Sequence, residues 1–292
     1  MRLYPPFAVA IIGSALLWIA VEPRPLPGVS LWFNDGNWQP KPTAMIVLAH
    51  LAMTNNKHFQ GLDVVMWSLV HEARISIIFP FIATAVSRQW ILALLAAFII
   101  AEVSRNAATG SSFEMWYNPA DTLQFLALFV IGAVMALHAT SIRLKLSSLS
   151  TVQKTIIWIA ALTALVASTS SSSYSILAQG GAASVVALSY ADARAERFLS
   201  SKLPAWLGKI SYSLYLVHLP VLFTLVHVLW GRLPIITILA LGVASSLLIA
   251  DMMYRFVELP SMRIGRILAM SFTKPTYTVE SKASPQNAEL KA

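Results

Sequence analysis

Long apolar stretches alternate along the chain with short polar breaks at proline, glycine or clustered charge. A helix needs about 20 apolar residues to cross a bilayer, because each residue advances it by about 1.5 Å. The pattern predicts an all-α, polytopic membrane bundle of about eight transmembrane helices. The predicted spans are residues 5–21, 64–86, 90–104, 121–138, 155–171, 175–191, 210–230 and 234–257.

Three segments depart from this simple pattern. Residues 44–53 are apolar but too short to cross, which favours a re-entrant or interfacial helix. The two spans within 155–191 are separated only by the serine run 168–173, so another division of that stretch stays open. The end of the chain is rich in Lys, Glu, Ser, Pro and Thr and lacks the apolar surface that would offset chain entropy. We therefore predict a transmembrane domain at 1–270 and a disordered cytoplasmic tail at 271–292.

The composition supports a membrane location. Of the 292 residues, 57% are hydrophobic and 12% are charged, whereas soluble domains carry about a quarter charged residues. The absence of cysteine excludes disulfides, thiolate metal sites and a cysteine nucleophile, and we predict no metal site. The start of the chain runs through Pro5 and Pro6 into a long apolar span instead of a signal-peptide pattern, so we expect no cleavage.

The formal charge of +8 has two interpretations, nucleic-acid binding or basic loops on the cytoplasmic side of a membrane. With the N-terminus inside, fifteen of the 21 lysines and arginines fall in cytoplasmic segments, five fall outside and Arg74 lies within a span. This bias explains the charge by topology, places both termini in the cytoplasm and makes a nucleic-acid partner unnecessary. The outside residues are Arg24, Lys41, Lys57, Arg105 and Arg232.

The span 64–86 contains the run Trp-Ser-Leu-Val-His-Glu at residues 67–72. A charged side chain at mid-helix costs about 2.5–3.5 kcal/mol on insertion scales, so we expect either a partner or a function. A span that only anchors a protein rarely holds three ionisable groups, and this one holds His71, Glu72 and Arg74.

Two polar faces on the same helix indicate a crowded interior position. His71 and Arg74 share one face, whereas Ser68 and Glu72 lie on another. For Glu72, a structural salt bridge and a catalytic or ligand-positioning role both stay open. Trp67 is either part of such a site or an interfacial anchor.

A second polar row lies in the span that begins near residue 210. Ser211, Tyr215 and His218 fall at i, i+4 and i+7 and therefore share one helix face. Such a row can bind a polar ligand, or it can bond to neighbouring helices at about 1 kcal/mol for each hydrogen bond. The structural interpretation is favoured for the serine and the tyrosine. Both interpretations stay open for the histidine, because imidazole also relays protons.

A third cluster lies in the last span, where Asp251, Arg255 and Glu258 again fall at i, i+4 and i+7. Acid and base can pair along a helix at this spacing, so we expect Asp251 and Arg255 to neutralise each other. Glu258 is then either a second partner of Arg255 or a free carboxylate at the cytoplasmic edge. Pro260 is expected to end the helix.

These segments carry a resemblance to a known family. The run at 67–72 followed by Phe79-Pro80 resembles the Trp-Ser-Leu-x-x-Glu…Pro signature of the acyltransferase-3 family, integral membrane O-acyltransferases that include O-antigen acetylases. Residues 207–218 resemble its Leu-Gly-x-Ile-Ser-Tyr-x-x-Tyr-Leu-x-His run, and Glu258-Leu-Pro260 matches its Glu-x-Pro motif. Residues 125–132 resemble its Phe-x-x-Gly span more weakly.

The resemblance implies a roughly ten-helix domain in the bacterial cytoplasmic membrane. Such proteins move an acyl group, usually acetyl from acetyl-coenzyme A, onto a hydroxyl of a carbohydrate, lipid-linked glycan or related acceptor, without a tightly bound cofactor. Glu72 and His218 would line the interior cavity as catalytic candidates, while Arg2 would contact coenzyme A phosphates and Glu258 would orient it. The residues expected to support substrate binding are Trp67, Ser68, Ser211, Tyr212 and Tyr215.

The beginning of the chain departs from the family pattern. Arg2-Leu-Tyr-Pro-Pro resembles the end of the family's Arg-x-x-Arg pair, so the first arginine would precede Met1. The first two family helices, with the histidine taken as the catalytic base, are then expected to be missing. His71 is a weak replacement, because adjacency to Glu72 puts it on a different face. The alternatives are a truncated, non-catalytic protein of the same fold and a small-solute transporter, although the paired broken helices of many transporters are not found.

Overall fold

The computed structural model describes residues 3–35, 38, 41–53, 61–107, 119–167 and 176–272. Every regular element in these ranges is a helix, which confirms the all-α prediction. The elements are α1 (Tyr4–Val21), α2 (Leu31–Asp35), α3 (Ala44–Leu51), α4 (Met66–Ala107), α5 (Pro119–Gln124), α6 (Leu126–Leu137), α7 (Ala139–Ser147), α8 (Thr151–Ala167), α9 (Ile176–Ala191), α10 (Ala193–Leu199), α11 (Lys202–Leu229), α12 (Ile235–Met253), the π-helical turn η3 (Tyr254–Glu258) and α13 (Leu259–Phe272).

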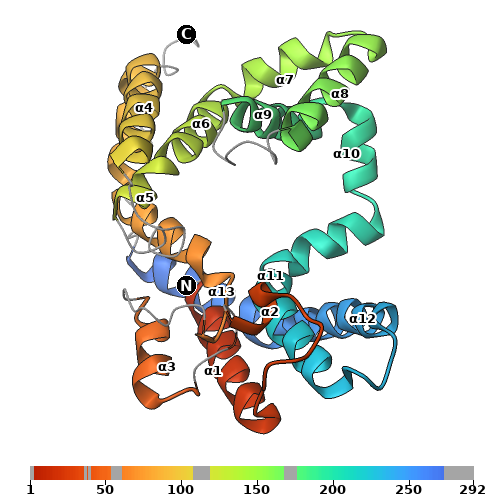
Figure 1. Cartoon of the computed structure of the whole chain (residues 1–292). Coiled ribbons are helices and arrows are strands. Elements are labelled where there is room, and N and C mark those ends of the chain that lie inside the picture. Colours follow the sequence, from red (N-terminus) through yellow and green to blue (C-terminus); the bar gives the residue numbers. More distant parts are fainter. Residues whose placement is uncertain are drawn as a thin grey trace, which may run out of the picture.

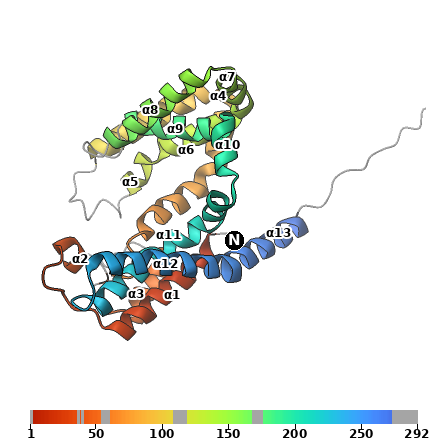
Figure 2. The same ribbon diagram turned by 90° about the vertical axis from the view of Figure 1, so that its right-hand side faces the viewer.

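The helices form two groups that lie one above the other in Figures 1 and 2. The terminal group is built from both ends of the chain and contains α1, α2, α3, α11, α12, η3 and α13. The middle group contains the second half of α4 and the helices α5 to α10. The first half of α4 leads from the terminal to the middle group, and α10 leads back to α11 (Figure 1).

The terminal group contains the larger core. Phe7 and Ile11 of α1 are fully buried in one cluster with Ile210 and Leu216 of α11. α1 begins with two prolines in its first turn, where a missing N–H costs nothing. Lipid is as apolar as these side chains, so close van der Waals contact, and not water exclusion, stabilises this cluster within the bilayer.

α3 lies along α1 and is too short to cross, with only eight residues, as predicted for this segment. Three hydrogen bonds fix the path around it: Trp18 Nε1 donates to the carbonyl of Trp38 at 2.8 Å, Tyr4 Oη to that of Leu51 at 3.0 Å and Ser14 Oγ to that of Leu62 at 2.5 Å. Trp38, Leu51 and Leu62 thus contact the last turns, the first turn and the middle of α1. The choice between a re-entrant and an interfacial helix stays a prediction.

The spans predicted at 64–86 and 90–104 belong to one element, α4. A straight helix of its 42 residues would be about 63 Å long, twice the thickness of the hydrocarbon core. Gln89 interrupts it with non-helical dihedrals, φ −146° and ψ 65°, at the position expected for the break between two spans.

Within the described ranges, four helices are long and apolar enough to cross a membrane, or up to five if a bent pair counts as one span. α5 and α6 together form one arm of that pair, and they meet α7 at 73°. α8 and α9 are apolar but have only 17 and 16 residues. Each of the eight predicted segments contains helix, but this criterion does not confirm the number eight. The serine run 168–173 lies outside the described residues.

α8 and α9 approach each other closely in the middle group. A Cβ atom added at Gly181 would lie 2.8 Å from the carbonyl oxygen of Ala161 and 3.2 Å from the Cβ of Ala164. Only a residue without a side chain fits this contact, which is typical of helix pairs in membranes.

The end of α12 corrects two predictions. Pro260 does not end the helix, because α13 continues from Leu259 through it. The preceding turn, η3, is π-helical, and this wider turn accommodates a proline ring that would clash with the carbonyl of residue 256 in a regular α-helix. The extra residue in the turn rotates Glu258 away from Asp251 and Arg255. Glu258 is fully buried, whereas 64% of the Arg255 side chain is exposed.

Candidate functional site

α11 connects the three sequence motifs through hydrogen bonds on two of its faces. Tyr215 bonds to Ser68 of the 67–72 run, and Ser213 bonds to Glu258 of the Glu-x-Pro motif. The partners are 147 and 45 positions apart in the chain. The structure thus brings the motifs together around one helix, although not into a single cluster.

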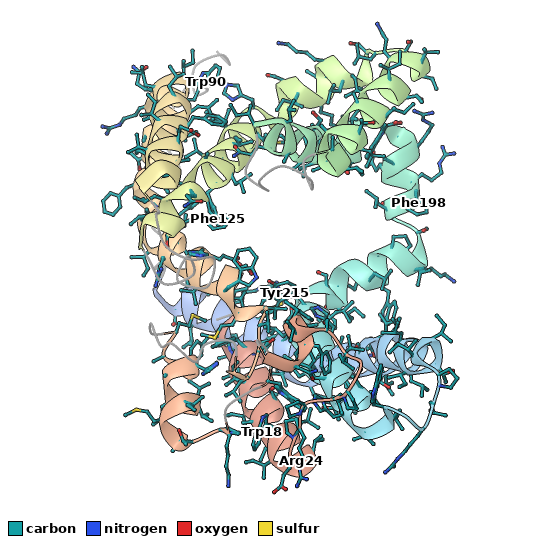
Figure 3. The ribbon with its side chains drawn as sticks, in the orientation of Figure 1. Trp18, Arg24, Trp90, Phe125, Phe198 and Tyr215 are labelled. Carbon is teal, nitrogen blue, oxygen red and sulfur yellow. The ribbon has the colours of Figure 1, made fainter. Side chains whose placement is uncertain are left out.

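The contact between α4 and α11 is made by two hydroxyls. The Ser68 and Tyr215 hydroxyls are hydrogen-bonded to each other at 2.7 Å, and both lie within reach of the Val65 carbonyl, at 3.4 and 2.9 Å. In Figure 3, Tyr215 lies at the edge of the terminal group that faces the middle group, while Trp18 and Arg24 mark its opposite end. The pair fixes the start of α4 against the polar face of α11.

Asp63 is a buried acid beside this pair that the sequence interpretation missed. It is 1% exposed, its Oδ1 accepts the Val65 N–H at 3.4 Å, and its Oδ2 has no partner among the described residues. The carboxyl and the Tyr215 hydroxyl thus bond to the N–H and the carbonyl of the same residue, Val65. The sequence did contain a clue, because Asp63 is an acid directly before an apolar span. It was missed because residue 63 lies just outside the predicted segment 64–86.

Glu72 is half-buried on α4, near enough to the Tyr215 phenol to act on it electrostatically. It makes no hydrogen bond or ion pair with any described residue, so the salt-bridge interpretation finds no support in this part of the chain.

The other polar face of α4 contacts the middle group. Thr122 Oγ1 accepts a hydrogen bond from Arg74 at 3.1 Å and lies 3.0 Å from Nδ1 of His71. The His71 ring lies 4.8 Å from the Phe125 ring, and Trp67 lies 5.8 Å from the same ring. The two polar faces predicted for this helix are therefore used by different neighbours. Trp67 packs inside the protein and not only at an interface.

Glu258, the last residue of η3, contacts α11 on a different face, through Ser213. The polar cluster around it lies near the start of α1. Ser213 Oγ donates to Glu258 Oε2 at 2.8 Å, and Ser261 Oγ donates to the Glu258 carbonyl at 2.8 Å. Tyr212, which adjoins Ser213, donates to the carbonyl of Leu3 at 2.7 Å. Arg2 itself lies outside the described residues.

His218 lines a groove of 910 Å³ between α11 and α12 together with Ser211 and Tyr215. Its Nδ1 lies 2.8 Å from the carbonyl of Tyr215 and 3.1 Å from that of Leu214. Carbonyls only accept, so Nδ1 carries the proton and Nε2 of the neutral ring keeps its lone pair. This tautomer has the form of a general base.

Three ion pairs among the described residues lie outside these clusters, and the longest joins Arg143 to Glu196 at 3.6 Å. Arg255 bonds to both carboxylate oxygens of Asp251, at 2.6 and 3.3 Å, which confirms the predicted neutralisation, and Trp206 Nε1 donates to the same carboxylate at 2.8 Å. At the start of α10, the hydrogen bonds from Arg194 hold the pKa of Asp192 below its usual range and raise that of the guanidinium.

Among the described residues, no group of three or more His, Asp and Glu is placed to hold a metal ion.

Comparison with protein families agrees with the motifs. The family model for the acyltransferase-3 family, described as an acyltransferase domain, matches residues 1–255, well over half of the chain. The match includes the 67–72 and 207–218 runs, and Glu258-Leu-Pro260 lies just beyond it. No curated protein and no solved structure matches the chain. The chain therefore belongs to the acyltransferase-3 family.

Proposed function

We propose that this protein transfers an acetyl group from acetyl-coenzyme A to a hydroxyl of a carbohydrate or lipid-linked glycan in the bacterial cytoplasmic membrane, with both termini in the cytoplasm. Family membership indicates membrane acyltransferase activity. The observation that carries the proposal is the position of α11, which bonds to Ser68 of one motif and to Glu258 of another. Motifs that serve only local folding have no need to meet on one helix.

The proposed chemistry is acyl transfer by general base catalysis. Nε2 of His218 takes the proton of the acceptor hydroxyl while its oxygen attacks the thioester carbonyl carbon. A carbon–oxygen bond forms, the carbon–sulfur bond breaks, and the proton passes to the leaving sulfur of coenzyme A. The carboxylate of Glu72, which has no partner among the described residues, accepts hydrogen bonds from hydroxyls of the acceptor and orients it.

We assign the donor phosphates to the cytoplasmic end of the terminal group. Leu3 is held there by Tyr212, and Glu258 is buried nearby in its cluster with Ser213. Arg2 is joined directly to Leu3, and its guanidinium suits bidentate contact with a phosphate. In this proposal Glu258 orients the guanidinium.

The test is acetyl transfer by purified wild-type protein in lipid nanodiscs. Radiolabelled acetyl-coenzyme A is supplied with a lipid-linked glycan, and transfer is measured with the release of free thiol. Arg2→Ala and Glu258→Ala are expected to weaken donor binding at least tenfold. Asp251→Asn, two turns before Glu258, alters the ion pair with Arg255 and the hydrogen bond from Trp206 and is expected to leave binding unchanged.

Two outcomes contradict the proposal. If the folded wild-type protein neither binds nor consumes acetyl-coenzyme A, the non-catalytic alternative replaces it. If donor binding is unchanged in both variants, their assigned roles are wrong even though transfer stands.

A further inference from the structure

The groove between α11 and α12 has the size and lining of a small-molecule site. Its 910 Å³ lies within the range of about 300–1,000 Å³ found for ligand pockets. Its walls are apolar apart from Ser211, Tyr215, His218 and Ser246.

Ser246 is the least expected of these polar groups. The residue is 4% exposed, lines the groove from α12 and makes no hydrogen bond with any described residue. Its hydroxyl is therefore left to bond to a ligand that enters the groove.

The register of the two helices places this hydroxyl opposite His218. Leu222 Cδ1 lies 3.1 Å from the position that a Cβ on Gly242 would occupy, so these two residues are at the same depth. α11 and α12 are antiparallel neighbours joined by a short turn. Residues four positions further inward, His218 and Ser246, therefore lie about 6 Å deeper and again face the same level of the groove.

We propose that this groove binds the acyl-pantetheine arm of the thioester donor, with its carbonyl between His218 and Ser246. The inference rests on the proposed function and adds the place where the donor lies. An extended arm has thirteen bonds between phosphorus and sulfur and is about 16 Å long, and α11 advances about 15 Å from Gly208, at the inner end of the groove, to His218.

The polar row also matches the chemistry of the arm. The two amides of pantetheine are about 5 Å apart, and Ser211, Tyr215 and His218 follow one another along α11 at about 6 and 4.5 Å. Ser211 donates to the carbonyl of Gly208, so its lone pairs are left to accept an amide N–H. The Ser246 hydroxyl is left to donate to the thioester carbonyl, where negative charge develops during attack.

The absence of cysteine allows a direct test. Ser246→Cys introduces a single thiol into the groove, and Ser245→Cys introduces one at nearly the same depth on another face of α12. The full-length proteins, in nanodiscs, are treated with bromoacetyl-coenzyme A. The thiolate attacks the bromine-bearing carbon, a carbon–sulfur bond forms and bromide leaves. The attached mass is followed by mass spectrometry, with the wild type as the control for attack on other side chains.

We expect Ser246→Cys to be alkylated at least tenfold faster than Ser245→Cys, and saturating acetyl-coenzyme A to abolish the difference. Equal rates, or rates insensitive to acetyl-coenzyme A, overturn the groove assignment. The proposed function is judged separately by acetyl transfer with the wild-type protein. Selective alkylation without transfer supports the groove assignment and contradicts the proposed function. Transfer with unselective alkylation supports the proposed function and contradicts the groove assignment.

A second variant covers the case in which the new thiol disturbs the helix. Ser211→Leu removes an amide acceptor from the inner part of the arm, away from the reacting carbon. It is expected to raise KM for acetyl-coenzyme A at least fivefold with little change in kcat. A fall in kcat at constant KM contradicts the assigned position of the arm.

Discussion

The terminal and middle groups differ in how they are held together. In the most apolar stretch of each span of the terminal group, 33% of α1, 39% of α11 and 22% of the span Ile235–Leu268 are buried, against 11% of α4, which leads into the middle group. Both groups bury polar side chains: the terminal group encloses Ser213, Ser246 and Glu258, and the middle group Thr122, Gln124 and Gln179. The difference lies in the core, because the terminal group has the larger apolar clusters, whereas the middle group has close backbone contacts such as that at Gly181. The middle group is held mainly by helix contact and lipid.

The largest effect on stability is expected from truncating the core of the terminal group. Phe7 is fully buried between α1 and α11, so Phe7→Ala leaves a cavity and costs about 3–5 kcal/mol. Phe198→Ala is the matched control, because that ring is 66% exposed in the middle group. Thermal unfolding in detergent should show a large fall in Tm for the first variant and a negligible one for the second. Similar shifts would remove the distinction between the groups.

A smaller loss of stability is expected from separating α8 and α9. Gly181→Val places side-chain atoms against the Ala161 carbonyl and is expected to cost about 1–3 kcal/mol, while Gly132→Val meets open space. Since the contact lies in the middle group, binding of acetyl-coenzyme A by the folded fraction should be unchanged. Binding that falls in parallel with Tm would show that the two groups are not separable in function.

The hydrogen bond between α4 and α11 can be removed without changing any charged residue. Ser68→Ala deletes the hydrogen bond to Tyr215 and should cost about 1 kcal/mol. Ser76→Ala, on the exposed part of the same helix, is the control and should leave Tm unchanged. Equal Tm values for the two variants would mean that this bond contributes nothing to the position of α4.

The smallest effect should come from the polar start of α10, and it should depend on pH. The Asp192 carboxyl has a lowered pKa because Arg194 donates to it, so its ionised form stabilises the fold above the unfolded pKa of about 4. Asp192→Asn should lower Tm slightly at pH 7. The difference should disappear as the pH falls through the folded pKa, since both side chains are then neutral. A constant difference from pH 7 to pH 3 would contradict this origin.

The sequence indicated the helices better than their partners. The apolar run at 5–21 becomes Tyr4–Val21 because two prolines fix its start, and the break between two spans falls at Gln89. The π-turn could not be foreseen, because residues 251–258 have a regular α-helical spacing and only the proline two positions on disturbs it. Nor could the pairing of His71 with Thr122, 51 positions away, since no local pattern encodes a contact across the bundle.

Two buried groups were missed for a similar reason. Asp63 precedes the apolar span, and Ser246 is one of many serines in apolar surroundings. Asp63 stands out because one carboxylate oxygen has no partner among the described residues, and Ser246 because it lines the groove, and only a three-dimensional arrangement can reveal either feature.

The central claim is that acyl transfer depends on the polar face of α11 in the terminal group. The most direct measurement compares His218→Gln with His138→Gln, because each ring bonds through Nδ1 to the carbonyl four residues earlier, the first in the terminal and the second in the middle group. Acetyl transfer from acetyl-coenzyme A should fall at least about 100-fold in His218→Gln, as expected for loss of a general base, and stay near wild type in His138→Gln. Equal activity in the two folded variants would contradict the account.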